Sequence, residues 1–522
     1  MIYQGPAVEI PDIALVPFVL QRASELGDKP ALIDGPSGRQ LTYTALADGV
    51  KRAASALRRR GFKQGDVFAI FSPNLIEYPI AFLAVASLGG VVTTVNSLYT
   101  PRELADQLKN SGARFLLTMP AFMDRVNDAL KDAAIEETFV FGEADGATSF
   151  SELLAKPAED FSVNINPTED LVALPYSSGT TGIAKGVMLT HRNLVANVCQ
   201  AAQCFHVAEG ERVLGVMPFY HIYGMTVIMN LTLRSGGTIV TMPRFELEAF
   251  LRVLQDHRVR RVYVAPPIVV ALAKHPMIDQ FDLSSVALVF SGAAPLDEAL
   301  AAACSARLHC AVNQGYGMTE ASPVTHAVRD DVDWTKVGSV GPVAPGTDCI
   351  VVDITTGSAL GRGADGEIWI RGPQVMKGYL NNRAATEQIL DRDGWLHTGD
   401  IGHADKDGDF FIVDRLKELI KYKGYQVPPA ELEAILLSHP AVADAAVIPS
   451  PDDAAGEVPK AFVVLKSPVA PEELMRYVAE RVAPHKKVRL IEVIDEIPKS
   501  ASGKILRRKL VERERARTRL RS

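Results

Sequence analysis

The chain has 522 residues, 47% of them hydrophobic, and a formal net charge of −7. This length is too great for one hydrophobic core, so we expect at least two domains. The acidic balance argues against nucleic acid as a main partner, because proteins that bind the phosphate backbone carry a basic excess. The five cysteines show no metal-binding spacing and are interpreted as buried thiols in a reducing compartment. The N-terminus lacks the pattern of a signal peptide, so we expect a cytoplasmic protein.

Short apolar segments alternate with segments of helical periodicity in the first part of the chain. We expect helices over 43–60, 75–88 and 101–111, and strands over 67–71, 91–95 and 115–118. Such alternation predicts a largely parallel sheet covered by helices on both faces, with ligands at the carboxyl ends of the strands.

The uncharged stretch 79–101 is interpreted as a buried helix followed by a buried strand. Paired glycines and polar residues interrupt it before it reaches the roughly 20 apolar residues that a membrane span needs.

The segment 176–187 is rich in glycine and hydroxyl groups, and lies between a predicted strand over 171–175 and a predicted helix over 192–205. Backbone N–H groups and hydroxyls in such a loop can bind an anion, and Lys185 adds a positive charge. The combination predicts a triphosphate ligand. The segment is not a Walker A loop, because Gly186 follows the lysine where that motif has a magnesium-binding hydroxyl. The alternative is an ordinary polar surface loop.

Three later groups of residues also suggest a nucleotide site. Further strands are expected over 212–217, 237–242, 261–265 and 286–290, and several lead into Gly/Pro-rich turns where a ligand can approach the backbone. Tyr316 and Glu320 offer a ring for a purine and a carboxylate for magnesium, and Asp400 can accept hydrogen bonds from ribose hydroxyls. The alternatives are a structural turn with an exposed glutamate and, for Asp400, a helix cap or Asx turn.

Basic residues gather where the composition changes near residue 414. The segment 414–426 contains Arg415, Lys417, Lys421 and Lys423, and we interpret it as a β-hairpin with charges on one side, although such runs are usually solvated faces. We place the boundary of a large domain, 1–414, and a small α+β domain, 415–522, at this point.

The small domain is expected to contain helices over 430–438 and 472–482 and strands over 445–448 and 461–465. Near its end, Lys504 follows a Ser-Ala-Ser-Gly loop that could swing it into a site. The alternative is an exposed lysine in a terminal loop. Residues 506–522 are expected to form a solvated basic helix.

Taken together and in order, these groups resemble the adenylate-forming superfamily, which includes acyl-CoA synthetases, beetle luciferases and the adenylation domains of peptide synthetases. The resemblance extends from about residue 41 to 507 and is closest to the branch of 4-coumarate:CoA ligases, as seen in the segments 176–187, 218–225, 265–268, 291–296, 314–320 and 414–426. It implies an α/β fold with a large N-terminal domain of mainly parallel sheets and flanking helices, and a small mobile α+β C-terminal domain.

The resemblance implies an ATP-dependent reaction in two halves that uses Mg²⁺ and CoA. A carboxylate attacks the α-phosphate of ATP and gives an acyl-adenylate and pyrophosphate. The CoA thiol then attacks the acyl carbon, and AMP leaves. The residues implied for ATP are Ser177, Ser178, Gly179, Thr180, Thr181, Lys185, Gln314, Gly315, Tyr316, Thr319, Asp400 and Arg415, and those for magnesium are Thr181 and Glu320.

The resemblance also implies catalytic roles. Lys504 would contact the bridging oxygens during adenylation, Lys417 would be the hinge of the small domain, and the face containing Lys421, Lys423 and Gly424 would replace Lys504 for thioester formation. Arg244 replaces a lysine that relatives place near the CoA phosphate. His221 would lie beside the acyl site and gate the carboxylate, or would be a structural histidine.

The implied acyl pocket contains Tyr223, Thr226, Val227, Phe290, Ala293, Ala294, Gly317, Ser322, Pro323 and Val324. Tyr223 could stack on a flat ring, which favours a cinnamate-type acid. Many plant coumarate ligases have asparagine, lysine and glycine in place of Thr226, Phe290 and Ser322. Polar contacts to a phenol hydroxyl are lost, so we expect cinnamate to be as good a substrate as 4-coumarate.

Two other functions stay open. A medium- or long-chain fatty acyl-CoA synthetase would have the same fold with an open apolar tunnel. A noncatalytic nucleotide-binding regulator is disfavoured by the complete set of Lys185, Glu320, Asp400, Lys421 and Lys504, and pyrophosphate release would distinguish it.

Overall fold

The computed structural model describes residues 1–177, 184–331, 336, 338–423, 425–452, 455–500 and 503–519. The chain forms two compact units. The larger unit contains Gln4–Asp348 and Ile370–Leu396, and the smaller unit contains Met1–Tyr3, Cys349–Trp369 and His397–Ser522. The domain boundary proposed above at 414 and 415 stays a prediction.

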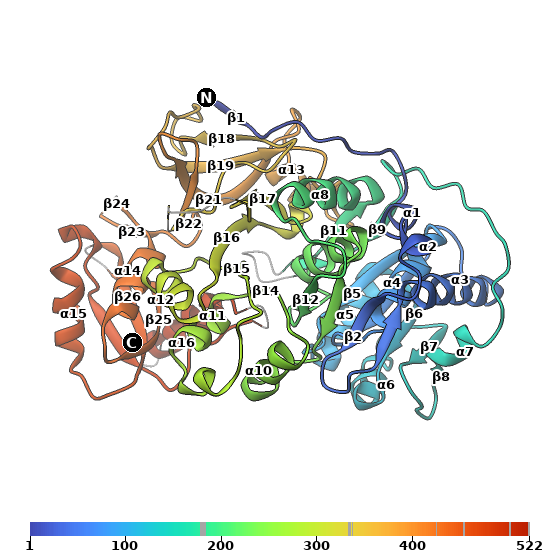
Figure 1. Cartoon of the computed structure of the whole chain (residues 1–522). Helices are drawn as coiled ribbons and strands as arrows, with labels where there is room; N and C mark the ends of the chain where they lie inside the picture. Colours follow the sequence, from blue (N-terminus) through green and yellow to red (C-terminus); the bar gives the residue numbers. More distant parts are fainter. Residues whose placement is uncertain are drawn as a thin grey trace. The chain divides into compact units, whose positions relative to one another are not determined.

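The first sheet of the larger unit has nine strands in the order β10-β11-β9-β5-β4-β6-β7-β8, with β20 also paired to β11 (Figure 1). Strands β9, β5, β4, β6, β7 and β8 are mutually parallel, as the alternating pattern predicts. The strands are β4 (Val67–Phe71), β5 (Val91–Val95), β6 (Ala113–Thr118), β7 (Glu137–Val140), β8 (Thr148–Ser149), β9 (Leu171–Ala173), β10 (Tyr176–Ser177), β11 (Lys185–Thr190) and β20 (Gly378–Tyr379).

The helices of this region begin and end where local signals favour it. Helix α5 begins with a capping box between Thr100 and Glu103 and ends at Gly112, whose φ of 67° suits glycine. Helix α4 is buried except at its last residue, and β5 is fully buried, so the uncharged stretch contains a buried helix followed by a buried strand, as predicted. Within the described residues, no helix is long and apolar enough to cross a membrane. The helices are α1 (Leu15–Val19), α2 (Ala23–Leu26), α3 (Tyr43–Arg59), α4 (Tyr78–Ser87), α5 (Pro101–Ser111), α6 (Met123–Ala129), α7 (Phe150–Leu154) and the 3-10 turn η1 (Pro120–Phe122).

The second sheet of the larger unit has eight strands in the order β17-β16-β15-β14-β12-β13-β2-β3, and the six from β16 to β2 are parallel. The strands are β2 (Pro30–Asp34), β3 (Gln40–Thr42), β12 (Arg212–Gly215), β13 (Thr238–Thr241), β14 (Arg261–Val264), β15 (Leu288–Ser291), β16 (Ala311–Gly317) and β17 (Val324–Ala327). The remaining helices of the larger unit are α8 (His191–Cys204), the π-helix η2 (Gly224–Asn230), α9 (Leu231–Ser235), α10 (Leu247–Asp256), α11 (Pro266–Lys274), η3 (Pro276–Gln280), α12 (Glu298–Leu308), η4 (Thr319–Ala321) and α13 (Arg383–Ile389).

The smaller unit is built on two sheets, one ordered β1-β18-β19-β21-β22 and one ordered β24-β23-β26-β25 with β27 beside β26. The strands are β1 (Ile2–Gln4), β18 (Asp348–Val352), β19 (Gly366–Arg371), β21 (Leu396–Ala404), β22 (Phe410–Arg415), β23 (Ile420–Tyr422), β24 (Tyr425–Val427), β25 (Val442–Asp452), β26 (Gly456–Leu465) and β27 (Leu490–Val493). The helices are α14 (Pro429–Ser438), α15 (Pro471–Ala479), η5 (Pro484–Lys486) and α16 (Arg507–Arg519).

Two predictions for the smaller unit need correction. Only the second half of the segment 414–426 forms a hairpin, in which β23 pairs with β24. The first residues of the segment, up to Arg415, end strand β22 instead. The terminal helix α16 is not simply solvated. Leu510 is buried against Ile448 and Phe462, and Lys460, itself buried, pairs with Glu514. Leu510, together with the partly buried Val511, packs this mainly basic helix against the sheet.

Candidate active site

The carboxylate of Glu320 is buried in the larger unit, with 6% of the residue exposed. The Ser177 hydroxyl donates a 2.9 Å hydrogen bond to its Oε1, and the Tyr379 hydroxyl donates one of 2.7 Å to the same oxygen. Lys185 Nζ lies 4.8 Å from the centroid of the Tyr379 ring. The structure therefore brings together Ser177, Lys185 and Glu320, which the sequence had proposed, and adds Tyr379, which it had not.

This arrangement fits a magnesium ion. Magnesium in nucleotide sites is usually held by one or two carboxylates together with substrate phosphates. Both hydroxyls bond Oε1 of Glu320, and in the described part of the chain no donor reaches Oε2, which could ligate the cation. The other proposed metal ligand, Thr181, lies outside the described residues, as do Ser178, Gly179 and Thr180.

The proposed phosphate segment does not run from a strand into a helix, as the sequence suggested. Strands β10 and β11 form an antiparallel pair in which Ser177 lies opposite Lys185. Helix α8 begins only after β11, where Thr190 and Asn193 form a capping box. Its first N–H groups are therefore partly satisfied within the chain, and any phosphate contact comes from the hairpin rather than from the helix end. The apolar run from Val187 to Leu189 was the signal for the missed strand.

The pairing of β11 with β20 explains why Tyr379 reaches Glu320. Val187 lies opposite Tyr379 in this antiparallel pair, and Leu380 N donates a 2.8 Å hydrogen bond to Gly186 O. A Cβ atom on Gly186 would lie 3.1 Å from the Tyr176 ring and 3.3 Å from Leu380, so a side chain would be crowded there. No motif surrounds Tyr379 in the sequence, which is why it was missed.

The residues proposed for adenine lie on β16 and the turn after it. Gln314 is largely buried and its Oε1 accepts a 3.2 Å hydrogen bond from Leu296 N. A Cβ on Gly315 would be 2.8 Å from the Phe290 ring, so the close approach requires glycine. Tyr316 and Thr319 are half-buried, and the Tyr316 ring lies 5.7 Å from that of His326. A purine could therefore reach Tyr316.

Tyr223, the residue proposed to face the acid, is buried in an aromatic group. Its hydroxyl donates a 3.2 Å hydrogen bond to Phe290 O, and its ring meets Tyr263 edge-on at 6.3 Å. Phe290 meets Phe205 edge-on at 4.7 Å. Burial raises the pKa of Tyr223 well above its ordinary value, so the phenol stays neutral. These rings provide flat apolar walls.

Four of the residues proposed for the acyl pocket lie on the π-helix η2 and in the turn after β15, and they differ in burial. Thr226 and Val227 are fully buried on η2, and the described residues offer the Thr226 hydroxyl no hydrogen-bond partner. Ala293 is exposed, with a φ of 72°, and Ala294 is half-buried. A π-helix of this kind often occurs at functional sites.

The segment from Gly317 to Val324 is tightly held. A Cβ on Gly317 would lie 2.1 Å from Pro323 O, so only glycine fits. Ser322 is fully buried, and its hydroxyl donates a 2.8 Å hydrogen bond to Gln374 O. The Ser322 hydroxyl is thus already engaged within the protein. Val324 begins β17.

His221 lies in the turn that leads into η2. It is half-buried, and its Nδ1 accepts a 3.3 Å hydrogen bond from Tyr223 N. A Cβ on Gly224 would lie 2.1 Å from Pro218 O, so glycine is needed to close this turn. The turn therefore fixes His221 beside Tyr223. Arg244, proposed for CoA, is exposed.

In the smaller unit, Asp400 and Arg415 lie opposite each other on β21 and β22. Arg415 Nε is 3.0 Å from Asp400 Oδ1, and Asp400 is 4% exposed. Burial and the charge of Arg415 lower the pKa of Lys504 to about 8, whereas Glu418 and Asp400 act in the opposite direction. Lys504 is therefore close enough to the Asp400–Arg415 pair to interact with both charges.

Lys504 lies on the return side of a small hairpin rather than on an open loop. Lys499 and Ile505 form an antiparallel bridge. Ser500 N donates a 2.8 Å hydrogen bond to Lys504 O, and Lys504 N donates one of 3.1 Å to Ser500 Oγ. The position of the lysine backbone is thus set by its own hairpin.

A largely buried group of charges near Lys504 was not predicted from the sequence. Arg507 pairs with Glu418 at 2.5 Å and with Glu433 at 2.6 Å. Burial raises the pKa of Asp414 to about 7, although hydrogen bonds from Ala430 N and Arg415 N oppose the shift. These charges link the segment after β22 to the start of α16.

The residues proposed for the hinge and for CoA are exposed. They are Lys417, Lys421 and Lys423, and Lys423 has a φ of 47°. Gly424 lies outside the described residues. The roles of these residues stay predictions.

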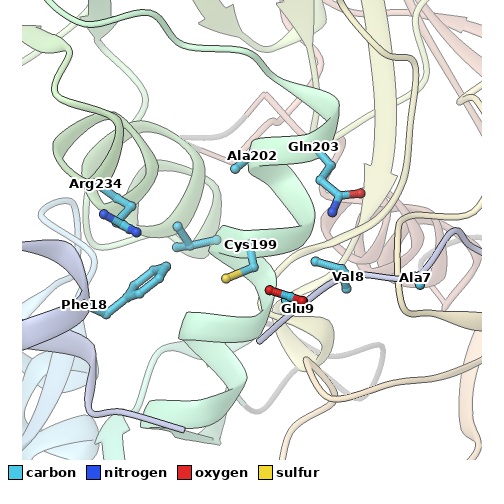
Figure 2. A pocket seen from close by; sticks show the side chains of 9 residues that line it. Ala7, Val8, Glu9, Phe18, Cys199, Ala202, Gln203 and Arg234 are labelled. Carbon is cyan, nitrogen blue, oxygen red and sulfur yellow. The ribbon is translucent and has the colours of Figure 1, made fainter. Parts of the chain in front are cut away.

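Two other features of the larger unit lie apart from these residues. A cavity of about 530 Å³ lies on the outer side of α8, with Cys199, Ala202 and Gln203 on one wall and Phe18 beneath Arg234 on another (Figure 2). None of the residues proposed for the acid line it. His206, Asp330 and Asp331 come close enough to share a cation, but Arg261 and Arg329 already pair with the two carboxylates.

Known proteins resemble the chain over almost its whole length. The family model of AMP-binding enzymes matches residues 19–380, and that of the AMP-binding enzyme C-terminal domain matches 431–504. The 4-coumarate–CoA ligase 3 of Oryza sativa subsp. japonica is 43% identical, with 97% of this chain and 93% of the relative covered. The 4-coumarate–CoA ligase of Pinus taeda is 41% identical, with 97% and 96% covered.

Solved structures agree with the sequence relatives. The anthranilate CoA ligase AuaEII in complex with anthranoyl-AMP matches with a TM-score of 0.89 at 25% identity and covers 97% of this chain and 98% of its own. ATP-bound MatB from Rhodopseudomonas palustris matches with a TM-score of 0.87 at 29% identity, with 96% and 99% covered. The predicted fold class is confirmed.

Proposed function

Because the chain belongs to the family of AMP-binding enzymes, we propose that it is an ATP-dependent carboxylate–CoA ligase that acts on 4-coumarate and related cinnamates. It forms an acyl-adenylate and then an acyl-CoA thioester, and AMP is released. The observation that carries this proposal is the buried Glu320 carboxylate with Ser177, Tyr379 and Lys185 around it, in a chain 41–43% identical to 4-coumarate–CoA ligases of rice and pine.

The first half-reaction depends on positioning and on neutralising charge. Lys185 and the hydroxyl groups of the hairpin hold the β- and γ-phosphates. A magnesium ion at Glu320 would neutralise phosphate charge when bound. Tyr316 stacks on adenine, and Asp400 and Arg415 bind the ribose.

Lys504 supplies the cation at the α-phosphate. With a pKa of about 8, it is mostly protonated at neutral pH, and a phosphate nearby would favour the charged form further. For the second half-reaction, Lys417 acts as the hinge, and Lys421, Lys423, Gly424 and Arg244 lie along the path of CoA. His221 orients the carboxylate beside Tyr223.

The acid lies against the rings of Tyr223 and Phe290, with Thr226, Val227, Ala293, Ala294, Gly317, Ser322, Pro323 and Val324 completing the pocket. Flat aromatic walls favour a planar acid over a flexible aliphatic chain. We place the enzyme in the cytoplasm, because its five cysteines are all free thiols, as suits a reducing compartment.

The test is to measure pyrophosphate, AMP and thioester from ATP, Mg²⁺ and CoA with cinnamate, 4-coumarate, caffeate, ferulate, benzoate, hexanoate and palmitate. Preference for the cinnamates is the expected result. Preference for hexanoate or palmitate would show that the proposed acid substrate is wrong, although the proposed ligase reaction would still hold. No pyrophosphate with any acid would reject the proposed reaction and support a noncatalytic regulator.

A further inference from the structure

Helix α8 carries three buried amide side chains on one side. Asn193, Asn197 and Gln200 are spaced at i, i+4 and i+7, which places them in one stripe along the helix. They are 8%, 0% and 0% exposed. Buried amides are costly unless their groups are bonded, so their partners reveal what the stripe holds in place.

Asn197 clamps the main chain of Val324. Its Nδ2 donates a 2.9 Å hydrogen bond to Val324 O, and its Oδ1 accepts one of 3.0 Å from Val324 N. The same Nδ2 donates a 3.0 Å hydrogen bond to Gln200 Oε1. The side chain therefore binds both main-chain groups of Val324, as a neighbouring β-strand would.

The other two amides hold residues 373–375 of a second segment, 373–376. Asn193 Nδ2 donates to Pro373 O at 2.8 Å and to Val375 O at 2.9 Å. Gln200 Nε2 donates to Gln374 Oε1 at 2.9 Å. Helix α8 thus binds two segments that are far apart in the sequence.

These two segments in turn hold each other around Glu320. Ser322 Oγ donates to Gln374 O at 2.8 Å, and Met376 N donates to Glu320 O at 2.9 Å. Three residues after Met376, Tyr379 bonds the Glu320 carboxylate. The segment Glu320–Val324 is therefore held at three points. These are the main-chain carbonyl of Glu320, the side-chain hydroxyl of Ser322, and the main chain of Val324, where Asn197 supplies both bonds.

We infer that Asn197 is a positioning residue that sets the selectivity of the enzyme among acids. This inference rests on the proposed function, in which Val324 faces the acid and Glu320 serves the magnesium ion. Asn197 holds the Val324 end of the short segment whose other end is Glu320. A fully satisfied buried amide network gives a single rigid arrangement, and a rigid wall is what distinguishes a planar acid from a flexible one.

The test compares Asn197→Ala with Gln203→Ala. Gln203 lies on the same helix, is exposed, and lines the cavity beside α8 (Figure 2). For Asn197→Ala, kcat/KM for 4-coumarate in pyrophosphate release is expected to fall about tenfold or more, mainly through KM, because both hydrogen bonds to Val324 are lost together with the one to Gln200. The preference for 4-coumarate over hexanoate should fall as well, whereas KM for CoA should change less than about twofold. Gln203→Ala should match the wild type in kcat/KM for 4-coumarate, in the preference for 4-coumarate over hexanoate, and in KM for CoA.

A purely structural role for Asn197 predicts a different result. The unfolding temperature would then fall, with the KM for 4-coumarate and the preference over hexanoate unchanged at temperatures where the variant is folded. That outcome would overturn the inference. If Asn197→Ala does not fold, Asn197→Ser keeps one donor and one acceptor in a shorter side chain, and it should show the same changes to a smaller degree.

Hydrogen exchange separates a failure of this inference from a failure of the proposed function. Loss of the clamp on Val324 N should speed amide exchange in the peptide 320–328 of Asn197→Ala, and not in that of Gln203→Ala. A wild-type protein that releases no pyrophosphate with any acid rejects the proposed function. Unchanged exchange in this peptide rejects the positioning role, whether or not the wild type is active.

Discussion

The hydroxyl of Tyr379 donates a 2.7 Å hydrogen bond to the carboxylate of Glu320, although the two residues are 59 positions apart in the chain. The pairing of β20 with β11 makes the contact possible, because it carries Tyr379 to the hairpin that also contains Ser177 and Lys185. A carboxylate that accepts two hydroxyl hydrogen bonds is held in one orientation.

Tyr379→Phe removes one of the two hydrogen bonds to Glu320 without changing the ring. A hydrogen bond to a charged group is worth about 1.5–3 kcal/mol, so the Mg²⁺ concentration for half-maximal activity should rise roughly tenfold. Tyr176→Phe is the matched control, because its hydroxyl donates to Asn110 instead. Equal Mg²⁺ dependence in the two variants would contradict a role of Tyr379 in orienting Glu320.

Lys504→Ala should separate the two half-reactions. Removing a cation from the α-phosphate is expected to slow adenylate formation by roughly 10²–10³-fold. Thioester formation from supplied acyl-adenylate and CoA should stay close to the wild-type rate. The measurement is pyrophosphate release in one assay and acyl-CoA formation in the other. A similar loss in both would contradict the assignment of Lys504 to the first half-reaction.

The rate of adenylate formation should depend on pH through Lys504. Its pKa of about 8 is lowered by burial and by Arg415, and only the protonated form carries the useful charge. We therefore expect kcat/KM for ATP to be constant below this value and to fall as pH rises through it, since kcat/KM reports the free enzyme. Lys504→Arg keeps its positive charge at high pH. If this variant shows the same decrease in kcat/KM at alkaline pH, the decrease is due to the titration of another group.

Ala294→Gly should widen the acyl pocket. Ala294 is half-buried beside the strand that carries Phe290, and deleting its methyl group makes room for a methoxy substituent. We expect the ratio of kcat/KM for ferulate to that for cinnamate to rise about tenfold, as for other changes of one carbon in a pocket. Ala299→Gly, in the exposed part of α12, should leave the ratio unchanged. An unchanged ratio in Ala294→Gly would exclude this position from the pocket.

Asp414 should make stability depend on pH. Burial raises its pKa to about 7 in the folded protein, whereas an unfolded aspartate has a pKa of about 3.9. The folded state therefore binds the proton more tightly, and the resulting stabilisation is fully present below about pH 4 and is lost as pH rises through 7.

The variant Asp414→Asn tests this sign. The asparagine cannot ionise, so the stability of the variant relative to the wild type should increase between pH 4 and 7. The expected increase in the free energy of unfolding is on the order of 2–4 kcal/mol, and it is measured through the unfolding temperature of both proteins. Asp495→Asn, at an exposed site, is the control. A relative stability of Asp414→Asn that is flat or falling with pH would show that the buried carboxyl is not the titrating group.

The alternating strands and helices of residues 43–118 could be predicted closely, because each rests on local periodicity and on caps that lie within a few positions, as in α5. The predictions were less accurate where pairing with a distant segment determines the secondary structure. Strand β11 was missed because its apolar run is short and lies next to a predicted helix, and pairing with β9, β10 and β20 makes this run a strand.

The sequence by itself determined the fold class, the order of the elements and the residue types that act on a nucleotide, since these depend on local periodicity and on motifs of adjacent residues. Only the tertiary structure decided that Tyr379 and Ser177 share one oxygen of Glu320, that Asn197 clamps Val324, and that Arg507 lies between Glu418 and Glu433. Each of these contacts joins segments that are far apart in the sequence. A hydrogen bond depends on distance and direction in space, and neither can be read from position along the chain.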